Sequence, residues 1–145
     1  MDTQIKSKER VLAYGEVFTN PREVNAMLDL VKPETDRIDS RFLEPACGDG
    51  NFLIEILRRK LAICETRVTA KRYTQLQYEH DAVWAVSSIY GIEIQEDNAS
   101  ACRERLLNGL KYWSKYSGAK PSQLHVVYGG TTPMARSEAS VEVFR

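Results

Sequence analysis

The feature that most constrains the fold is a short apolar run that leads into a glycine-containing loop and then into a helical pattern. Phe42 and Leu43 precede the loop 44–51, which is rich in glycine and other turn-forming residues. After the loop, apolar side chains recur at the spacing of a helix, at Leu53, Ile56, Leu57 and Leu61. Strand, loop and helix in this order form half of a βαβ unit, which predicts an α/β fold.

Further elements are predicted on both sides of this unit. Asn20 is a helix-capping residue followed by proline, so a helix should begin near Pro21 and stop before Pro33. Its apolar stripe comprises Val24, Met27, Leu28 and Val31. Later in the chain, a buried helix over 82–89 should lead directly into a second strand at 90–94.

The last predicted elements are one more helix and one more strand. Asp97 or Asn98 can cap a helix, and residues 124–128 have the composition of a third strand. The apolar face of that helix comprises Ala99, Cys102, Leu106 and Leu110. The alternation of strands and helices predicts a doubly wound α/β fold with three layers, α/β/α, around a mostly parallel sheet.

The chain length of 145 residues allows one compact domain, which we place at residues 1–128. A polar insertion is expected at about 65–81, as a loop or a solvated helix whose tyrosines lie outside the core. Trp84 is expected in the core, and the basic run 58–60 on the solvated face of its helix. Residues 129–145 show little periodicity and are expected to form a disordered tail.

Charge and cysteine content argue against several classes of protein. Twenty basic residues balance twenty acidic ones, so no net charge draws the chain to nucleic acid. The cysteines Cys47, Cys64 and Cys102 have the spacing of neither a zinc site nor a disulfide framework, so no metal is expected. No apolar stretch is long enough to cross a membrane, and the first residues do not resemble a signal peptide. We therefore expect a soluble, cytoplasmic protein with reduced thiols.

The loop suits a ligand that carries both signs of charge. Its small residues let a ligand approach the backbone, and free amides at the following helix start attract a negative group. Neither a G-x-G-x-x-G sequence nor a P-loop is present, which argues against a dinucleotide or a nucleoside triphosphate. Glu44 and Asp49 favour a cationic group, and S-adenosylmethionine offers both an ammonium and a carboxylate. Glu93 would then accept hydrogen bonds from ribose hydroxyls, and Ile94 would pack on adenine.

Simpler interpretations of these residues stay open at this point. The loop taken alone is also compatible with an ordinary turn at the start of a helix. Glu93 taken alone is compatible with a solvated carboxylate at a strand end. Cys47 is a poor candidate for a nucleophile, because no histidine lies near it in the sequence.

Three segments resemble, in family order, the motifs of DNA amino-methyltransferases of the gamma arrangement. Residues 15–21 resemble the amino-terminal motif, in which a threonine before the first helix contacts the methionine moiety. Residues 42–52 resemble the first motif and 91–94 the second. The resemblance implies a partial Rossmann-like fold of the kind found in methyltransferases that use S-adenosylmethionine. The cofactor-binding residues that it implies are Phe18, Thr19, Glu44, Pro45, Ala46, Cys47, Gly48, Asp49, Gly50, Asn51, Phe52, Glu93 and Ile94.

The family methylates the exocyclic amine of a flipped-out adenine in DNA, within restriction-modification systems. Its catalytic motif, Asn-Pro-Pro-Tyr or Asp-Pro-Pro-Tyr, does not occur in the sequence, so no catalytic residue is assigned and the chain alone is expected to be inactive. A non-catalytic cofactor-binding or regulatory module, and a methyltransferase for another substrate, remain alternatives. The expected partners are DNA and either a second copy or a catalytic or specificity chain, because a partial sheet would expose an edge strand.

Overall fold

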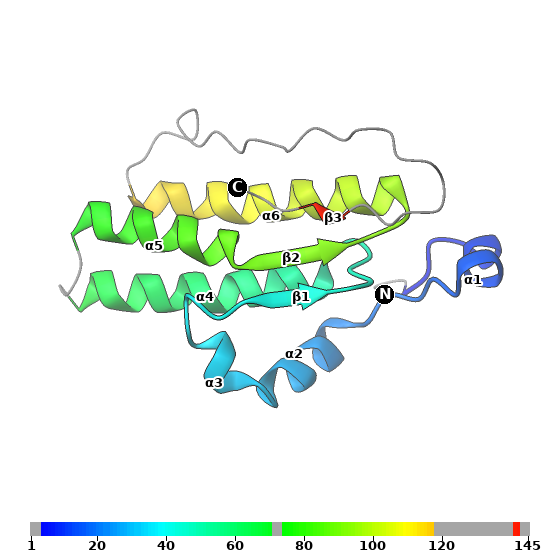
Figure 1. Cartoon of the computed structure of the whole chain (residues 1–145), viewed down its shortest axis with the longest axis horizontal. Coiled ribbons are helices and arrows are strands. Elements are labelled where there is room, and N and C mark those ends of the chain that lie inside the picture. Colours follow the sequence, from blue (N-terminus) through cyan, green and yellow to red (C-terminus); the bar gives the residue numbers. More distant parts are fainter. Residues whose placement is uncertain (1–3, 71–73, 118–140, 143–145) are drawn as a thin grey trace.

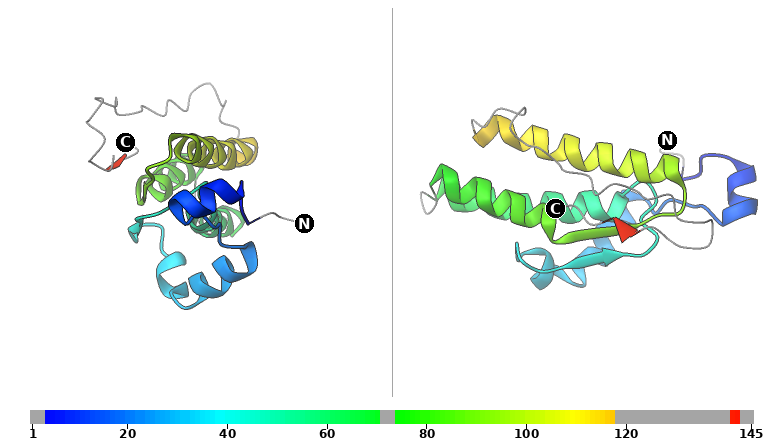
Figure 2. Two further views of the ribbon diagram at one scale, coloured as in Figure 1. Left: turned by 90° about the vertical axis from the view of Figure 1, so that its right-hand side faces the viewer. Right: turned by 45° about the horizontal axis from the view of Figure 1, so that its top comes forward.

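The computed structural model describes residues 4–70, 74–117 and 141–142 (Figure 1). In chain order the elements are α1 (Lys8–Tyr14), α2 (Pro21–Asp29), α3 (Lys32–Thr35), β1 (Phe42–Glu44), α4 (Asn51–Thr69), α5 (Gln75–Ser87), β2 (Ile89–Ile92), α6 (Glu96–Ser117) and β3 (Val141–Glu142). The helix α1 lies at one end of the molecule (Figure 2).

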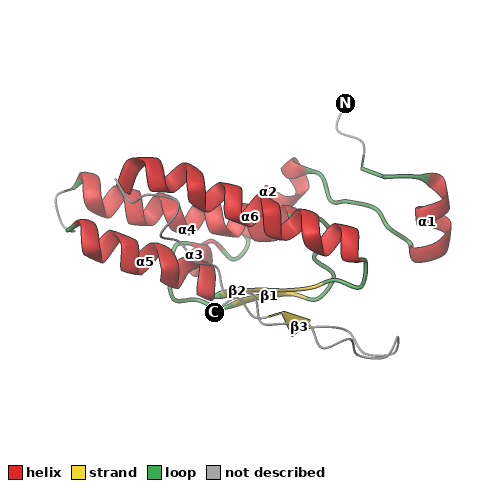
Figure 3. Cartoon of the chain, turned by 90° about the horizontal axis from the view of Figure 1, so that it is seen from above, coloured by secondary structure: helices red, strands yellow, loops and turns green. Residues whose placement is uncertain are grey.

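The strands form one small sheet in the order β1-β2-β3. β1 and β2 are parallel, with Phe42 opposite Ile89 and Leu43 opposite Tyr90, and β3 is antiparallel to β2. Parallel neighbours need a crossover connection, which α4 and α5 supply here. The long helices lie together on one side of the strands (Figure 3). The described residues therefore form part of an α/β domain, without the second helical layer of the expected three-layer fold.

The helix α4 is the centre of the core, because it contacts α2, α3, α5, α6 and β2. The four apolar residues that predicted this helix are at most 3% exposed, namely Leu53, Ile56, Leu57 and Leu61. Burying a side chain of this size stabilises the fold by about 1.5–3 kcal/mol compared with leaving it in water. The helical spacing found in the sequence thus identified the main core element correctly.

The start of α2 is also as predicted. The Asn20 side chain accepts a hydrogen bond of 3.0 Å from the backbone amide of Glu23, and Pro21 is the first helical residue. Of the predicted apolar stripe, Val24 and Leu28 are buried, whereas Met27 is 54% exposed and Val31 43% exposed. The helix ends at Asp29, well before Pro33, so Val31 lies beyond the helix and the stripe is narrower than expected.

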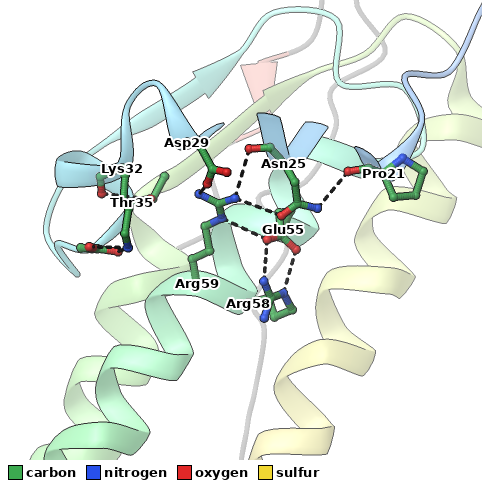
Figure 4. Close-up of polar contacts among 9 residues, drawn as sticks. Pro21, Asn25, Asp29, Lys32, Thr35, Glu55, Arg58 and Arg59 are labelled. Atoms are coloured by element: carbon green, nitrogen blue, oxygen red, sulfur yellow. Dashed lines mark hydrogen bonds and ion pairs between the residues drawn. The ribbon is translucent and has the colours of Figure 1, made fainter. Parts of the chain in front are cut away.

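Arg59 fastens α2 to the central helix (Figure 4). Its guanidinium donates to the side-chain oxygen of Asn25 at 3.0 Å and pairs with Asp29 at 2.8 Å, both on α2. The same group pairs with Glu55 on its own helix at 3.0 Å. The Arg59 side chain is 12% exposed and that of Asp29 is 63% exposed, so Arg59 reaches from the covered face of α4 to the edge of α2 and holds α2 against α4.

Two expectations about burial in the middle of the chain were wrong. The insertion 65–81 itself is mostly helical, one of its two expected forms, since α4 runs to Thr69 and α5 begins at Gln75. Tyr78 within it is 4% exposed and belongs to the core, whereas Trp84 is 51% exposed. Periodicity shows that α5 has an apolar face, but the position of α4 decides which residues of α5 are covered.

The basic run 58–60 is likewise not all on a solvated face. Lys60 is completely buried, and its ammonium donates to the carbonyl of Ile38 at 3.1 Å and also to the carbonyl of Ser40 and the hydroxyl of Ser88. These acceptors lie just before β1 and β2, where backbone oxygens need a donor. Burial lowers the pKa of Lys60 to about 8.

Other differences concern element boundaries. The helix α1 was not expected from the polar first residues; Ser7 caps it and Gly15 ends it. β2 stops at Ile92, and α6 begins at Glu96, one residue before the predicted capping positions. The predicted strand at 124–128 lies outside the described residues, as does most of the expected tail 129–145, in which β3 falls.

Candidate functional site

The site is built around the loop between β1 and α4, at the carboxyl end of the two parallel strands. The amide of Cys47 donates to the carbonyl of Ile92 at 3.0 Å, which fastens the loop to the end of β2. The amide of Gly50 donates to the carbonyl of Cys47 at 2.9 Å and closes a turn, and Gly50 is the residue that precedes α4. In open α/β sheets ligands bind at this edge, next to the first amides of the following helix.

Two glycines in the loop allow its close packing. Gly50 has φ 95°, and a Cβ there would lie 2.6 Å from Sγ of Cys102 on α6. Gly48 has φ 54°, and a Cβ there would lie 3.2 Å from the ring of Phe18. Both positions have a conformation that favours glycine; Gly50 leaves no room for a side chain, and at Gly48 the ring of Phe18 would have to shift slightly. The loop is thus held between the helix α6 and the segment before α2, residues 4–20, which we call the arm.

A cavity of about 280 Å³ opens beside this loop. The predicted site residues that line it are Phe18, Thr19, Glu44, Ala46, Cys47, Gly48, Asp49, Asn51, Phe52, Glu93 and Ile94. Pro45 and Gly50 do not line it. The cavity therefore brings together residues from all three segments that the sequence analysis singled out, although these segments are far apart along the chain.

Sequence reasoning missed further residues of the cavity wall: Tyr14, Gly15, Glu16, Val17, Gln95 and Asn98. Residues 15–17 belong to the amino-terminal motif segment, so their presence could have been predicted by extending the site over the whole motif. Gln95 and Asn98 follow the second motif segment, and no pattern in the sequence marks them.

The charged residues that line the cavity are all carboxylates. The side chain of Glu44 accepts a hydrogen bond from the amide of Ala46 at 3.3 Å, and that of Glu93 accepts one from the amide of Gln95 at 2.8 Å. A carboxylate accepts several hydrogen bonds, so both can also accept bonds from a ligand. An excess of acceptors favours a ligand that carries an ammonium or hydroxyl groups.

Asp49 provides an independent indication of a missing donor. Its Oδ2 pairs with Arg105 at 2.8 Å, but its Oδ1 is buried and has no hydrogen-bond partner among the described residues. A buried oxygen without a donor costs about 1–3 kcal/mol. A ligand that donates a hydrogen bond at this point would remove that cost, which suits the amino-acid end of S-adenosylmethionine.

The thiol of Cys47 stays protonated in this setting. Its interaction with the side chain of Cys102, together with burial, raises the pKa of Cys47. The same interaction lowers the pKa of Cys102. Cys47 is therefore unsuited to act as a nucleophile, because thiolates and not thiols attack. All three cysteines are free.

Two structural expectations can be compared with the described part of the chain. Within residues 4–70, 74–117 and 141–142, no cluster of three or more His, Cys, Asp or Glu side chains is arranged to hold a metal ion. None of the helices in those ranges has the length and apolar character needed to cross a bilayer.

Comparison with known proteins agrees with the geometry. The family model described as "MmeI, DNA-methyltransferase domain" matches residues 19–107, which is more than half of the chain. These residues include the loop, both parallel strands and most of the cavity wall. No curated protein and no solved structure matches the chain. The chain belongs to the family of MmeI-type DNA-methyltransferase domains, the methyltransferase part of restriction-modification enzymes.

Proposed function

We propose that this chain is the S-adenosylmethionine-binding portion of a site-specific DNA methyltransferase that modifies adenine. The observation that carries the proposal is the single cavity in which the arm segment with Phe18 and Thr19, the loop 44–51 and the end of β2 meet. Its volume of about 280 Å³ is close to the lower end of the range for small-molecule sites, about 300–1,000 Å³.

The cofactor would be held by groups of complementary charge. Glu44 and Asp49 would accept hydrogen bonds from its ammonium, and the amides at the start of α4 would bind its carboxylate. Thr19 would contact the methionine moiety. When bound, S-adenosylmethionine supplies a methyl group that a nucleophilic amine attacks.

The nucleoside end of the cofactor would lie at the end of β2. Glu93 would accept hydrogen bonds from the ribose hydroxyls, as an acidic residue does after the second strand of Rossmann-type sites. Ile94 is 73% exposed, and covering it with the adenine ring would remove apolar surface from water. The exposed apolar side chain of Ile94 would thereby contribute to cofactor binding.

Methyl transfer would need more polypeptide than the printed sequence. An adenine flipped out of the duplex must be held beside the methyl group, and the family does this with an Asn-Pro-Pro-Tyr type motif that the sequence does not contain. We therefore propose that the chain alone binds the cofactor without transferring its methyl group. DNA, and a second copy or a catalytic or specificity chain, would be its partners in the cytoplasm.

Calorimetric titration of the purified chain with S-adenosylmethionine tests the cofactor site. We expect saturable binding of one cofactor per chain, and loss of most of the affinity in Glu44→Ala and in Glu93→Ala. Asp36→Ala is the matched control, because it also removes a carboxylate but one that pairs with Lys32 on a helix outside the cavity. Native affinity in both cavity variants, or no binding by a folded native chain, would contradict the proposal.

A methylation assay tests the second part of the proposal, that the chain alone does not transfer the methyl group. The chain is incubated with adenine-containing duplex DNA and cofactor labelled in the methyl group. We expect no label in the DNA, at enzyme and cofactor concentrations that saturate the binding measured by calorimetry. Label recovered in adenine would show that residues of this chain suffice for transfer.

A further inference from the structure

The arm before α2 folds back on itself and forms one wall of the cavity. The amide of Phe18 donates to the carbonyl of Gln4 at 2.7 Å, and the Gln4 side chain donates to the carbonyl of Phe18 at 3.2 Å. The two ends of the arm are thereby joined, with α1 between them. Tyr14, Gly15, Glu16 and Val17, near the second end, line the cavity.

An ionic cluster fixes this arm to the first turn of α6. Asp97 on α6 accepts from Lys6 at 2.8 Å and from Arg10 at 3.0 Å. Arg10 also donates through Nε to Glu16 at 2.9 Å, so its guanidinium joins the cavity wall to α6. The Arg10 side chain is 23% exposed and that of Glu16 is 9% exposed. We call Lys6, Arg10, Glu16 and Asp97 the arm clamp.

The buried side-chain amide of Asn98, next to the clamp, adds two more contacts between α6 and the arm. Asn98 is 1% exposed, and its side-chain nitrogen donates to Glu16 at 2.9 Å. Its side-chain oxygen accepts a hydrogen bond of 2.5 Å from Lys6. Both ends of this amide are therefore bonded to the arm, which is what a fully buried amide in a stable contact requires.

The clamp spans the two sides of the cavity. Glu16 and Asn98 line the cavity, whereas Lys6, Arg10 and Asp97 do not. The first side is the arm, and the second is the chain that leaves β2 through Glu93 and enters α6. The arm helix α1 has no buried residues, so apolar packing contributes little to holding it. The contacts that join α1 to the first turn of α6 are therefore mainly charged ones.

We infer that Arg10 and Asp97 are positioning residues for cofactor binding: they hold the wall that carries Glu16, Phe18 and Thr19 against α6 before the cofactor enters. The inference rests on the proposed function, since it concerns the affinity of the same cavity. An arm that is already docked need not be ordered when the ligand binds, so the clamp raises affinity through preorganisation. Neither residue needs to touch the cofactor for this effect.

The test combines two measurements on the full chain. Hydrogen exchange of the amides in residues 4–18, followed without cofactor, reports whether the arm is docked. Calorimetric titration with S-adenosylmethionine reports the affinity. Both are made on the native chain, on Arg10→Met and on Asp97→Asn. Arg37→Met is the control, because it removes an arginine that pairs with Asp39 at 3.0 Å on the surface, away from the cavity.

We expect each clamp variant to exchange faster over residues 4–18 and to bind the cofactor about tenfold more weakly, as expected for the loss of charge-assisted hydrogen bonds. The thermal unfolding midpoint should change little, because no residue of α1 is buried. Arg10→Lys keeps the charge but not the planar fork, and it should restore part of the affinity. The variant Arg10→Met with Asp97→Asn should lose less affinity than the two single losses added together, because the Arg10–Asp97 contact is removed in both single variants, whereas Arg10–Glu16 and Lys6–Asp97 are each removed in one.

The dependence of cofactor affinity on ionic strength distinguishes the electrostatic contribution of the clamp from other effects of the substitutions. The clamp residues are partly exposed, so the affinity gained from them should decrease as ionic strength rises through about 0.1–1 M. The ratio of native to Arg10→Met affinity should therefore fall towards one at high salt. A ratio that does not change with salt would overturn the inference.

The remaining outcomes are distinguishable. Faster exchange with native affinity, or native exchange and native affinity in both variants, would overturn the inference and leave the proposed function intact. If the native chain binds no cofactor, the proposed function fails and the positioning role fails with it. If Glu44→Ala loses binding while Arg10→Met keeps it, only the positioning role is wrong.

Discussion

The side-chain amide of Asn51, the first residue of α4, donates a hydrogen bond of 2.9 Å to the backbone carbonyl of Thr19. The two residues are 32 positions apart in the chain. This one bond joins the arm that precedes α2 to the helix that follows the glycine loop. Two of the three segments that form the cavity are therefore connected directly, through a side chain of the motif itself.

Asn51→Ala should loosen this connection. The carbonyl of Thr19 would lose its side-chain donor in a partly buried place, so we expect the free energy of unfolding to fall by about 1 kcal/mol. Cofactor affinity should fall several-fold, because the arm would be less firmly placed. Denaturant unfolding and calorimetric titration measure the two effects. Ser87→Ala is a control, since that hydroxyl bonds only within its own helix; an equal effect of both variants would contradict the argument.

Gly50→Ala should be among the most damaging small substitutions in the loop. It combines a left-handed φ of 95° with a Cβ placed 2.6 Å from Sγ of Cys102. We expect a loss of about 3 kcal/mol in the free energy of unfolding, from backbone strain together with overpacking. Gly15→Ala has a similar strain, φ 64°, but nothing within 4 Å of the added atom, so about 1 kcal/mol is expected there.

The combination with Cys102→Ala checks the steric part of this prediction. Removing the sulfur should recover part of the cost of Gly50→Ala, leaving mainly the strain of the backbone. Denaturant unfolding of the single and double variants gives the coupling. If the two substitutions are additive, contact with Cys102 is not the cause.

Lys60 should make stability depend on pH in the alkaline range. Its pKa is lowered by burial to about 8 in the folded chain, below its value of 10.5 in an unfolded chain. Between these values the unfolded state binds more protons, so the free energy of unfolding should rise with pH from about 8 to 10.5. The rise is at most about 3 kcal/mol, the equivalent of the shift in pKa.

Lys60→Met tests the origin of that rise. The variant should lose the dependence on pH between about 8 and 10.5, measured by denaturant unfolding at a series of pH values. It would also leave three buried acceptors without their donor, at a cost of about 1–3 kcal/mol. Arg58→Met, on the exposed side of the same helix, should keep the native pH profile. If the free energy of unfolding of Lys60→Met rises with pH as in the native chain, a group other than Lys60 causes the rise.

Arg59→Met should release α2 from α4. It removes contacts to Asn25, Asp29 and Glu55 from a side chain that is 12% exposed (Figure 4), and we expect a loss of about 2 kcal/mol. The neighbouring Arg58 pairs with Glu55 and is 63% exposed, so Arg58→Met should cost less than about 1 kcal/mol. Chemical denaturation of the two variants compares them directly. Equal losses would mean that the tie to α2 contributes nothing.

Local patterns predicted the elements around the loop well. Asn20 and Pro21 marked the start of α2, and the spacing of Leu53, Ile56 and Leu57 identified α4 and its buried face. These signals work because capping and helical periodicity depend on residues within about four positions of one another. The same is true of the loop, whose glycines are required by its own backbone as well as by its neighbours.

By itself, then, the sequence determined the order of strand, glycine loop and helix, and with it a DNA-methyltransferase family and most of the residues that line the candidate cavity. Only the tertiary structure decided that Lys60 is buried, that Trp84 is exposed and that Arg10 meets Asp97 across 87 positions of the chain. The physical reason is that burial and ion pairing depend on which faces of distant elements meet. No pattern confined to neighbouring residues contains that information.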